Sequence, residues 1–252
     1  MKGTIFLKPL EYSIIANGER WRQGDKINGC LRIKNHGSDN IELNVLTFSL
    51  ALGYFKKIKI KDKKAWEVLA EINLGEKIVI EALEEKEFVW DFVLPEDCQI
   101  TEKDKSLFLV FKTNEELWAT GQLELVIEPK LVINQLLEIF QNFLRFKILQ
   151  TKFSKGMVEI KLNPPSSREL SHVESFILRV KEVDNILDLE YTFNMLVFET
   201  VAGNVMTQKK IKQVQQQLTS KQYYVYGNTL NQDFLIETFS AVIKEATPKF
   251  YM

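Results

Sequence analysis

Residues 187–195, LDLEYTFNM, indicate the fold class because apolar and polar side chains alternate along them without a break. On a β-strand this period of two places one set of side chains in a core and the other set in solvent. The same alternation recurs in four further segments, at 88–94, 123–127, 158–162 and 176–180. The pattern predicts an all-β protein built from many short strands, as in β-sandwiches and barrels.

Two segments replace the period of two by spacings of three and four residues, which predicts amphipathic helices over 131–147 and 231–246. The apolar stripe of the first helix is Ile133, Leu136, Leu137, Phe140 and Leu144. That of the second is Leu235, Phe239, Val242 and Ala246, after Asn231 as a cap. For 208–222 two interpretations stay open, a helix or an exposed glutamine-rich strand.

The first predicted helix divides the strands into two blocks, each the size of a sandwich of about 100–130 residues. We therefore predict an N-terminal β-sandwich domain over 1–128 and a C-terminal domain over 129–252. The second domain is expected to hold the junction helix, a second β-sandwich and the C-terminal helix.

Composition argues against several classes of function. The 252 residues carry 33 basic and 34 acidic side chains, so the basic excess of a nucleic-acid-binding protein is absent. Two cysteines, Cys30 and Cys98, and two histidines, His36 and His172, occur at spacings that match no metal site. We expect buried, reduced cysteines and solvated histidines, with no catalytic residue, cofactor or metal. With no signal peptide and no apolar run of roughly 20 residues, we expect a cytoplasmic protein.

Two charged segments stand out. Residues 56–64, KKIKIKDKK, hold six lysines, and those at 57, 59 and 61 alternate, which predicts a strand with a basic face. Two interpretations of these lysines stay open. They either prevent aggregation through an exposed sheet edge, or they form a binding surface for an acidic partner or lipid headgroup. The candidate binding residues are Lys56, Lys57, Lys59, Lys61, Lys63 and Lys64. The acidic run at 81–87 is interpreted as a solvated turn.

The N-terminal block resembles a known family. Residues 24–33, GDKINGCLRI, resemble the G-D-x-[IV]-x-G-x-[LV]-x-[IL] strand entry of arrestin-like N-domains, and residues 88–95, FVWDFVLP, are similar to their F-x-F-x-[LI]-P strand end. A helix after Pro129 resembles the bacterial sporulation-control branch of this superfamily. The resemblance implies two tandem arrestin-like β-sandwiches hinged together, acting as a non-enzymatic adaptor or scaffold.

Three hypotheses on function follow. The leading one is a cytoplasmic adaptor that binds other proteins, not nucleic acid, through sandwich edges and faces, in stress, sporulation-like or trafficking regulation. The second is a peripheral membrane or anionic-surface binding protein that uses the lysines of residues 56–64. The third is a hydrolase whose site is assembled from scattered acids. Whether the chain forms a homo-oligomer stays open.

Overall fold

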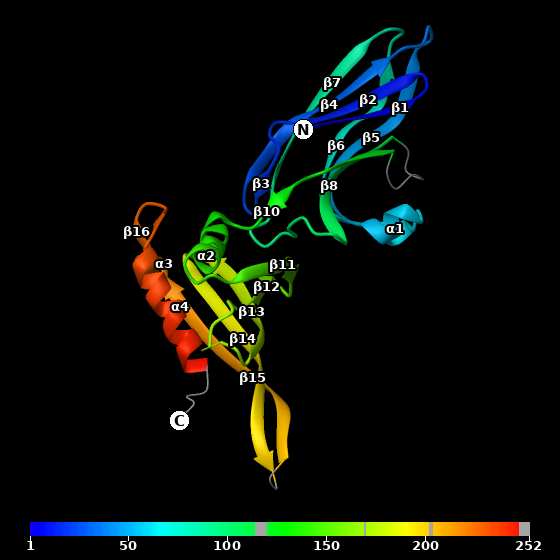
Figure 1. Ribbon diagram of the computed structural model, residues 1–252. Helices are drawn as coiled ribbons and strands as arrows, with labels where there is room; N and C mark the ends of the chain where they lie inside the picture. Colours follow the sequence, from blue (N-terminus) through cyan, green and yellow to red (C-terminus); the bar gives the residue numbers. More distant parts are fainter. Residues whose placement is uncertain (114–119, 169, 202–203, 247–252) are drawn as a thin grey trace. The chain divides into compact units, whose positions relative to one another are not determined.

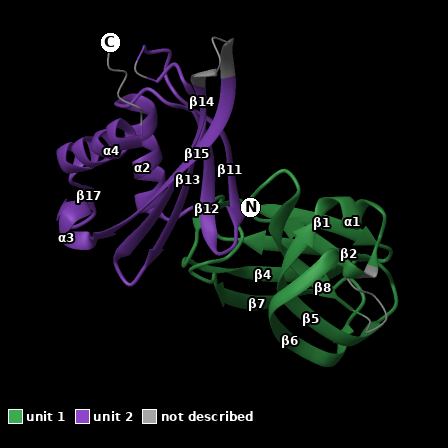
Figure 2. Ribbon diagram, turned by 90° about the horizontal axis from the view of Figure 1, so that it is seen from below, with its two compact units in different colours: residues 1–128 green, residues 129–252 purple. Residues whose placement is uncertain are grey.

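The computed structural model describes residues 1–113, 120–168, 170–201 and 204–246. The chain forms two compact units, residues 1–128 and 129–252 (Figure 2). The division falls between Glu128 and Pro129, where the sequence also places it. Most described residues lie in antiparallel β-strands (Figure 1), which confirms the prediction of a mainly β protein.

Unit 1 contains two four-stranded antiparallel sheets and a short parallel pair. The first sheet has the spatial order β1 (Lys2–Leu7), β2 (Leu10–Ala16), β4 (Lys26–Asn35) and β7 (Glu85–Val93). The second has the order β6 (Trp66–Ile80), β5 (Ile41–Tyr54), β8 (Lys105–Lys112) and β9 (Gly121–Glu124). The parallel pair is β3 (Trp21–Arg22) with β10 (Ile127–Glu128).

The core of unit 1 lies between these two sheets. Aromatic pairs join them: the ring of Tyr12 in β2 stacks on Phe111 in β8 at 4.8 Å, and Phe48 in β5 stacks on Trp90 in β7 at 5.0 Å. All four side chains are buried, so each stabilises the sandwich by roughly 1.5–3 kcal/mol. Unit 1 is thus a β-sandwich.

Gly29 explains part of the 24–33 motif. It lies in β4 opposite Ala16 and Trp90, and a Cβ atom placed there would come within 1.9 Å of the Ile15 carbonyl oxygen. A side chain is therefore excluded where the backbones approach this closely.

Unit 2 is built on a single five-stranded antiparallel sheet whose strands follow one another in sequence order. They are β11 (Lys147–Ser154), β12 (Met157–Asn163), β13 (Val173–Val183), β14 (Ile186–Val201) and β15 (Asn204–Thr219). Two helices, α2 (Leu131–Asn142) and α4 (Gln232–Ala246), lie on one face of this sheet (Figure 2). Between β15 and α4 come three small elements: α3 (Ser220–Tyr223), β16 (Tyr224–Tyr226) and β17 (Thr229–Leu230).

The predicted second β-sandwich is wrong, because helices take the place of its second sheet. Phe140 of α2 is fully buried, stacks on Phe239 of α4 at 4.8 Å between ring centroids, and lies 5.7 Å from Phe176 of β13. The alternation in the strands reports one buried face and does not report which element covers it.

The junction helix is shorter than predicted and ends at Asn142 instead of residue 147. Arg145 has a φ of 61°, and Lys147 already begins β11. Leu144 continues the apolar spacing without being helical, and the buried Phe146 packs against Phe140, with 5.9 Å between ring centroids.

The other two predictions for unit 2 concern its last third. The helix predicted over 231–246 is confirmed as α4, one residue shorter at its start. In 208–222 the structure has the glutamine-rich strand β15 up to Thr219, followed by the single turn α3.

Candidate binding surfaces

The lysine segment, residues 56–64, connects β5 to β6 through two short helical turns, α1 (Phe55–Lys59) and η1 (Lys63–Ala65) (Figure 1). The predicted basic strand is therefore wrong. Phe55 and Ile58, three residues apart, both pack on the apolar cluster of Ala51, Phe108 and Val110. A helical turn brings side chains three apart to one side, whereas a strand would place them on opposite faces. This spacing was the signal for a helix.

The base of the lysine segment is held against β8 by aromatic contacts. The ring of Phe108 meets Phe55 edge-on at 5.8 Å and Trp66 edge-on at 5.1 Å, and Trp66 is the first residue of β6. Both ends of the segment are thus fixed to the same sheet. They pack on the face of this sheet that points away from the core of the sandwich, and the lysines lie on that outer side.

The lysines of the segment point their charges to solvent. Lys56, Lys59, Lys61 and Lys64 are exposed, while the Nζ of Lys57 lies 4.7 Å from the centroid of the Tyr54 ring. The side chain of Lys63 lies outside the described residues.

None of the five described lysines forms an ion pair with a carboxylate in the part of the chain that the structure describes. The Asp62 carboxylate instead accepts a hydrogen bond from the Lys64 backbone N–H at 2.8 Å. Lys56 and Lys59 lie three residues apart in α1, about 5 Å along the helix axis, which is less than a Debye length of about 8–10 Å, so their potentials add.

The two histidines lie in different units. His36 is half-exposed, with its Nε2 2.8 Å from Glu11 Oε2. His172 is only 5% exposed, and burial lowers its pKa, so the prediction of a solvated side chain is wrong there. Its carbonyl accepts a hydrogen bond from the Leu196 N–H at 2.8 Å, which holds this residue against β14.

The cysteines and the acidic run have structural surroundings. Cys30 and Cys98 are buried free thiols, as predicted, and burial raises the pKa of Cys98 to about 12, which keeps its thiol protonated. In the acidic run, Glu85 and Glu87 belong to β7 and pair with Arg32 of β4 at 3.1 and 3.0 Å. The predicted turn thus covers only the first part of the run.

Unit 2 carries a row of alternating charges that the sequence did not reveal. The strand register places Lys152, Glu159, Arg179 and Glu190 side by side on β11 to β14. In this charge ladder the closest N–O distance is 2.9 Å for Lys152 with Glu159 and 2.8 Å for Glu159 with Arg179. It is 3.7 Å for Arg179 with Glu190. Opposite charges are thus neutralised within the sheet face.

Glu159 is the buried member of the charge ladder, at 8% exposure. Burial raises its pKa, but hydrogen bonds from Lys152 and Arg179 outweigh burial, so its pKa lies below the usual range. A carboxylate held ionised in this way stabilises the sheet and is a poor general acid.

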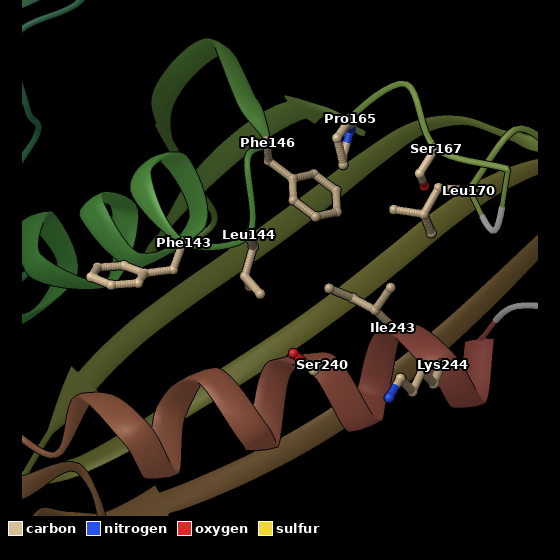
Figure 3. Close-up of a pocket in the computed structure, with 9 residues that line it drawn as sticks. All are labelled: Phe143, Leu144, Phe146, Pro165, Ser167, Leu170, Ser240, Ile243 and Lys244. Atoms are coloured by element: carbon tan, nitrogen blue, oxygen red, sulfur yellow. The ribbon is translucent and has the colours of Figure 1, made fainter.

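A small pocket of about 270 Å³ lies in unit 2 between the end of α2, the loop before β13 and α4 (Figure 3). Leu144, Phe146, Leu170 and Ile243 converge on it, with Ser240 on α4. Its volume is below the roughly 300–1,000 Å³ usual for small-molecule sites, so it suits one apolar side chain.

The described residues contain neither a metal-ligand cluster nor a membrane-spanning helix. No group of three or more His, Cys, Asp or Glu side chains among them is placed to hold a metal ion. None of the helices that the structure describes is long and apolar enough to cross a membrane.

Comparisons with known proteins bear on the fold. Neither a scan of protein-family models nor a search of curated proteins found a match. Among solved structures, the chain is similar to Spo0M, a sporulation control protein from Bacillus subtilis, with a TM-score of 0.64 and 13% identity over 94% of this chain and 97% of that one. The resemblance to the sporulation-control branch is thus confirmed at the level of the fold.

A second solved structure is the alkylpurine DNA glycosylase AlkC of Pseudomonas fluorescens, bound to DNA with an abasic site analog. It has a TM-score of 0.29 and 15% identity over 45% of this chain and 28% of that chain, a likeness that supports no argument.

Proposed function

We propose that the protein is a non-enzymatic adaptor that binds acidic segments of other proteins through its lysine segment. The observation that carries this proposal is that exposed lysines of the segment form no ion pair with any carboxylate that the structure describes. Lys56, Lys59 and Lys61 stand free of described carboxylates on a base fixed by Phe55 and Ile58. Cations that are not neutralised internally steer and bind anionic partners.

Two titratable groups, Glu159 and Cys98, support a binding role over catalysis. The buried carboxylate Glu159 is neutralised by Lys152 and Arg179, and the pKa of Cys98 is raised by burial. Neither arrangement favours a reactive acid or nucleophile. The fold shared with a sporulation control protein favours a regulatory process, such as sporulation-like or stress regulation. A cytoplasmic location is part of the same proposal.

A lipid surface is a second candidate because of Ile60. This side chain is 74% exposed in the middle of the lysine segment, between Lys59 and Lys61. An apolar side chain among cations is typical of contacts with anionic lipid headgroups. The proposal favours protein partners, because one exposed isoleucine inserts little apolar area, and membrane binding is an outcome of the test.

The test measures binding of two purified probes, a polyglutamate peptide and phosphatidylserine vesicles, to three forms of the full chain. One is the parent, and one carries Lys56→Glu, Lys59→Glu and Lys61→Glu. The matched control carries the same charge change at Lys2, Lys8 and Lys103, which are also exposed residues of unit 1.

The segment variant is expected to lose at least tenfold in affinity for polyglutamate, while the control keeps most of it. Binding should also weaken with salt, because exposed charges are screened. Binding to the vesicles alone, abolished by Ile60→Ser, would replace the adaptor by a membrane-surface protein. Equal loss in both charge variants would show that only net charge matters and would overturn the proposal.

A further inference from the structure

Strand β15 forms one edge of the five-stranded sheet of unit 2 (Figure 1). It pairs with β14 along 16 residues without a register shift and contains no proline. Its other side presents a row of backbone N–H and C=O groups, which can pair with a further strand.

The other long edges of the described sheets are protected against such pairing. β11, at the opposite edge of the same sheet, has a register shift between Ile148 and Gln150. β6 has two shifts against β5, and β7 begins with three consecutive charged residues, Glu85, Lys86 and Glu87. Bulges and charges of this kind discourage strand addition. By contrast, β15 has no β-bulge along its length, and it has no charged residue after Lys212.

The free edge carries three glutamines on one face. Gln213, Gln215 and Gln217 are exposed and alternate with Val214 and Gln216. The register places Gln215 next to Glu190 and Gln217 next to Asp188, and the two amides donate hydrogen bonds to these carboxylates at 3.5 and 2.7 Å. The charge ladder therefore ends at this edge on a neutral amide, which has a second N–H and a carbonyl oxygen for a further partner. An amide both donates and accepts hydrogen bonds, so it is complementary to another amide, whereas a lysine or glutamate repels its own kind.

We propose that β15 pairs with β15 of a second copy of this chain, in antiparallel orientation about a two-fold axis at Gln215. In this register Gln215 faces its own copy, and Gln213 faces Gln217 of the second copy. All three glutamines on the face then meet glutamines. The same surface is used on both chains, as a two-fold interface requires, and two sheets of five strands become one continuous sheet.

The lysines of β15 limit the registers in which two copies of the strand can pair. With the axis at Gln215, residues 211–219 of the two copies overlap, and Lys212 lies opposite Leu218. Registers that overlap more of the strand would move Lys209, Lys210 and Lys212 toward the same residues of the second copy. Like charges opposite each other are destabilising, so the neutral half of β15 is the self-complementary half. This inference uses no residue of the lysine segment and stands apart from the adaptor proposal.

The first test is the mass of the full chain in solution, by analytical ultracentrifugation over a range of concentrations. We expect a species of twice the chain mass. Gln215→Lys places two cations on the axis and should weaken association at least tenfold. Gln208→Lys is the matched control: it makes the same change at an exposed position of the same strand, outside 211–219, and should leave the dimer intact.

The second test reads the register by disulfide trapping. Opposed Cα atoms in antiparallel strands lie about 4.5–5.5 Å apart, which suits a disulfide. Gln215→Cys should therefore link two chains under mild oxidation. Gln213→Cys should not, because its two copies would lie about 13 Å apart along the strands. The natural Cys30 and Cys98 are buried and give a low background.

Melting curves of the variants should match that of the parent chain, because the substituted side chains are exposed. A monomer at all concentrations would overturn the proposal, as would a dimer that Gln215→Lys leaves unchanged. Trapping through Gln213→Cys but not Gln215→Cys would also overturn it, because the axis would then lie elsewhere. Assemblies larger than a dimer would contradict it too, since a two-fold pairing consumes the only edge that it uses.

Discussion

Units 1 and 2 contain the same kind of alternating strand, but different elements pack on the buried face of their sheets. In unit 1 the buried face of one sheet meets a second sheet, through pairs such as Phe48 with Trp90. In unit 2 the buried face meets helices, through Phe140 and Phe176. The difference teaches that a period of two fixes which side chains are buried, while the cover depends on which other segment offers an apolar face.

The two units also treat their charges differently. The lysine segment of unit 1 leaves its described cations without ionic partners, whereas the charge ladder of unit 2 pairs each charge with its opposite across neighbouring strands. Neutralised charges stabilise a surface, and uncompensated charges attract a partner. This comparison supports the proposal that partners bind at unit 1, whereas the ladder of unit 2 neutralises its own charges.

The largest effect is expected for Phe140→Asp, which tests whether the helices close unit 2. An unpaired carboxylate would be buried among Phe176 and Phe239, so the free energy of unfolding should fall by more than about 4 kcal/mol. Phe143→Asp, at a residue that is 51% exposed just after α2, is the control and should keep the protein soluble. Thermal unfolding of both variants measures the difference. Equal melting temperatures would show that α2 does not seal the sheet.

Phe48→Ala makes the corresponding test in unit 1. Phe48 is fully buried against Trp90 and Phe92, and its truncation should cost roughly 3–5 kcal/mol. Hydrogen exchange should rise in β5, β7 and β8 while the strands of unit 2 stay protected, because each unit has its own core. Phe6→Ala, at a 64% exposed position, should change neither. Loss of protection in both units would contradict the separation into two cores.

A smaller effect is expected at the charge ladder and depends on pH. The pKa of Glu159 in the folded state lies below its unfolded value, so ionised Glu159 stabilises the fold above the ordinary glutamate pKa. This contribution is lost as the pH falls through the lowered pKa. Glu159→Gln should cost roughly 1–3 kcal/mol at neutral pH.

The pH dependence separates a lost charge from lost packing. Thermal unfolding should show the Glu159→Gln deficit shrinking as the solution is acidified. Glu190→Gln, at a side chain that is 36% exposed and 3.7 Å from Arg179, is the control and should cost less than about 1 kcal/mol. A Glu159→Gln deficit that stays constant with pH would argue against ionic stabilisation.

The smallest effect concerns the single described aromatic contact of a lysine in the lysine segment. Lys57→Ala removes the cation from the Tyr54 ring and should destabilise unit 1 by about 0.5–1 kcal/mol. Lys59→Ala, at an exposed lysine, should change stability by less than about 0.5 kcal/mol. Chemical denaturation of the two variants resolves the difference, and identical midpoints would remove Lys57 from the structural contacts.

Particular residues show how far sequence reasoning reaches. The strands, the C-terminal helix and the division at Glu128 follow from local periodicity and turn residues. The cover of the second sheet does not, because it depends on contacts such as Phe140 with Phe239, about 100 residues apart.

The candidate site shows the same limit. The high number of lysines in residues 56–64 identifies the segment from sequence alone. The prediction of a strand there is wrong, because Phe55 and Ile58, three residues apart, pack on the same cluster and so require a helical turn. The charge ladder could not be predicted, because Lys152, Glu159, Arg179 and Glu190 become neighbours only through strand register. Register is a property of the folded sheet and is not visible in any one segment.

The most direct test of the central claim, that uncompensated lysines of unit 1 select the partners, is comparative capture from an extract of the native host. The parent chain, the Lys56/Lys59/Lys61→Glu variant and the Lys2/Lys8/Lys103→Glu control serve as bait, and mass spectrometry quantifies the retained proteins. We expect proteins that the parent enriches to be lost from the segment variant and kept by the control. Retention of the same proteins at the same levels by all three baits would contradict it.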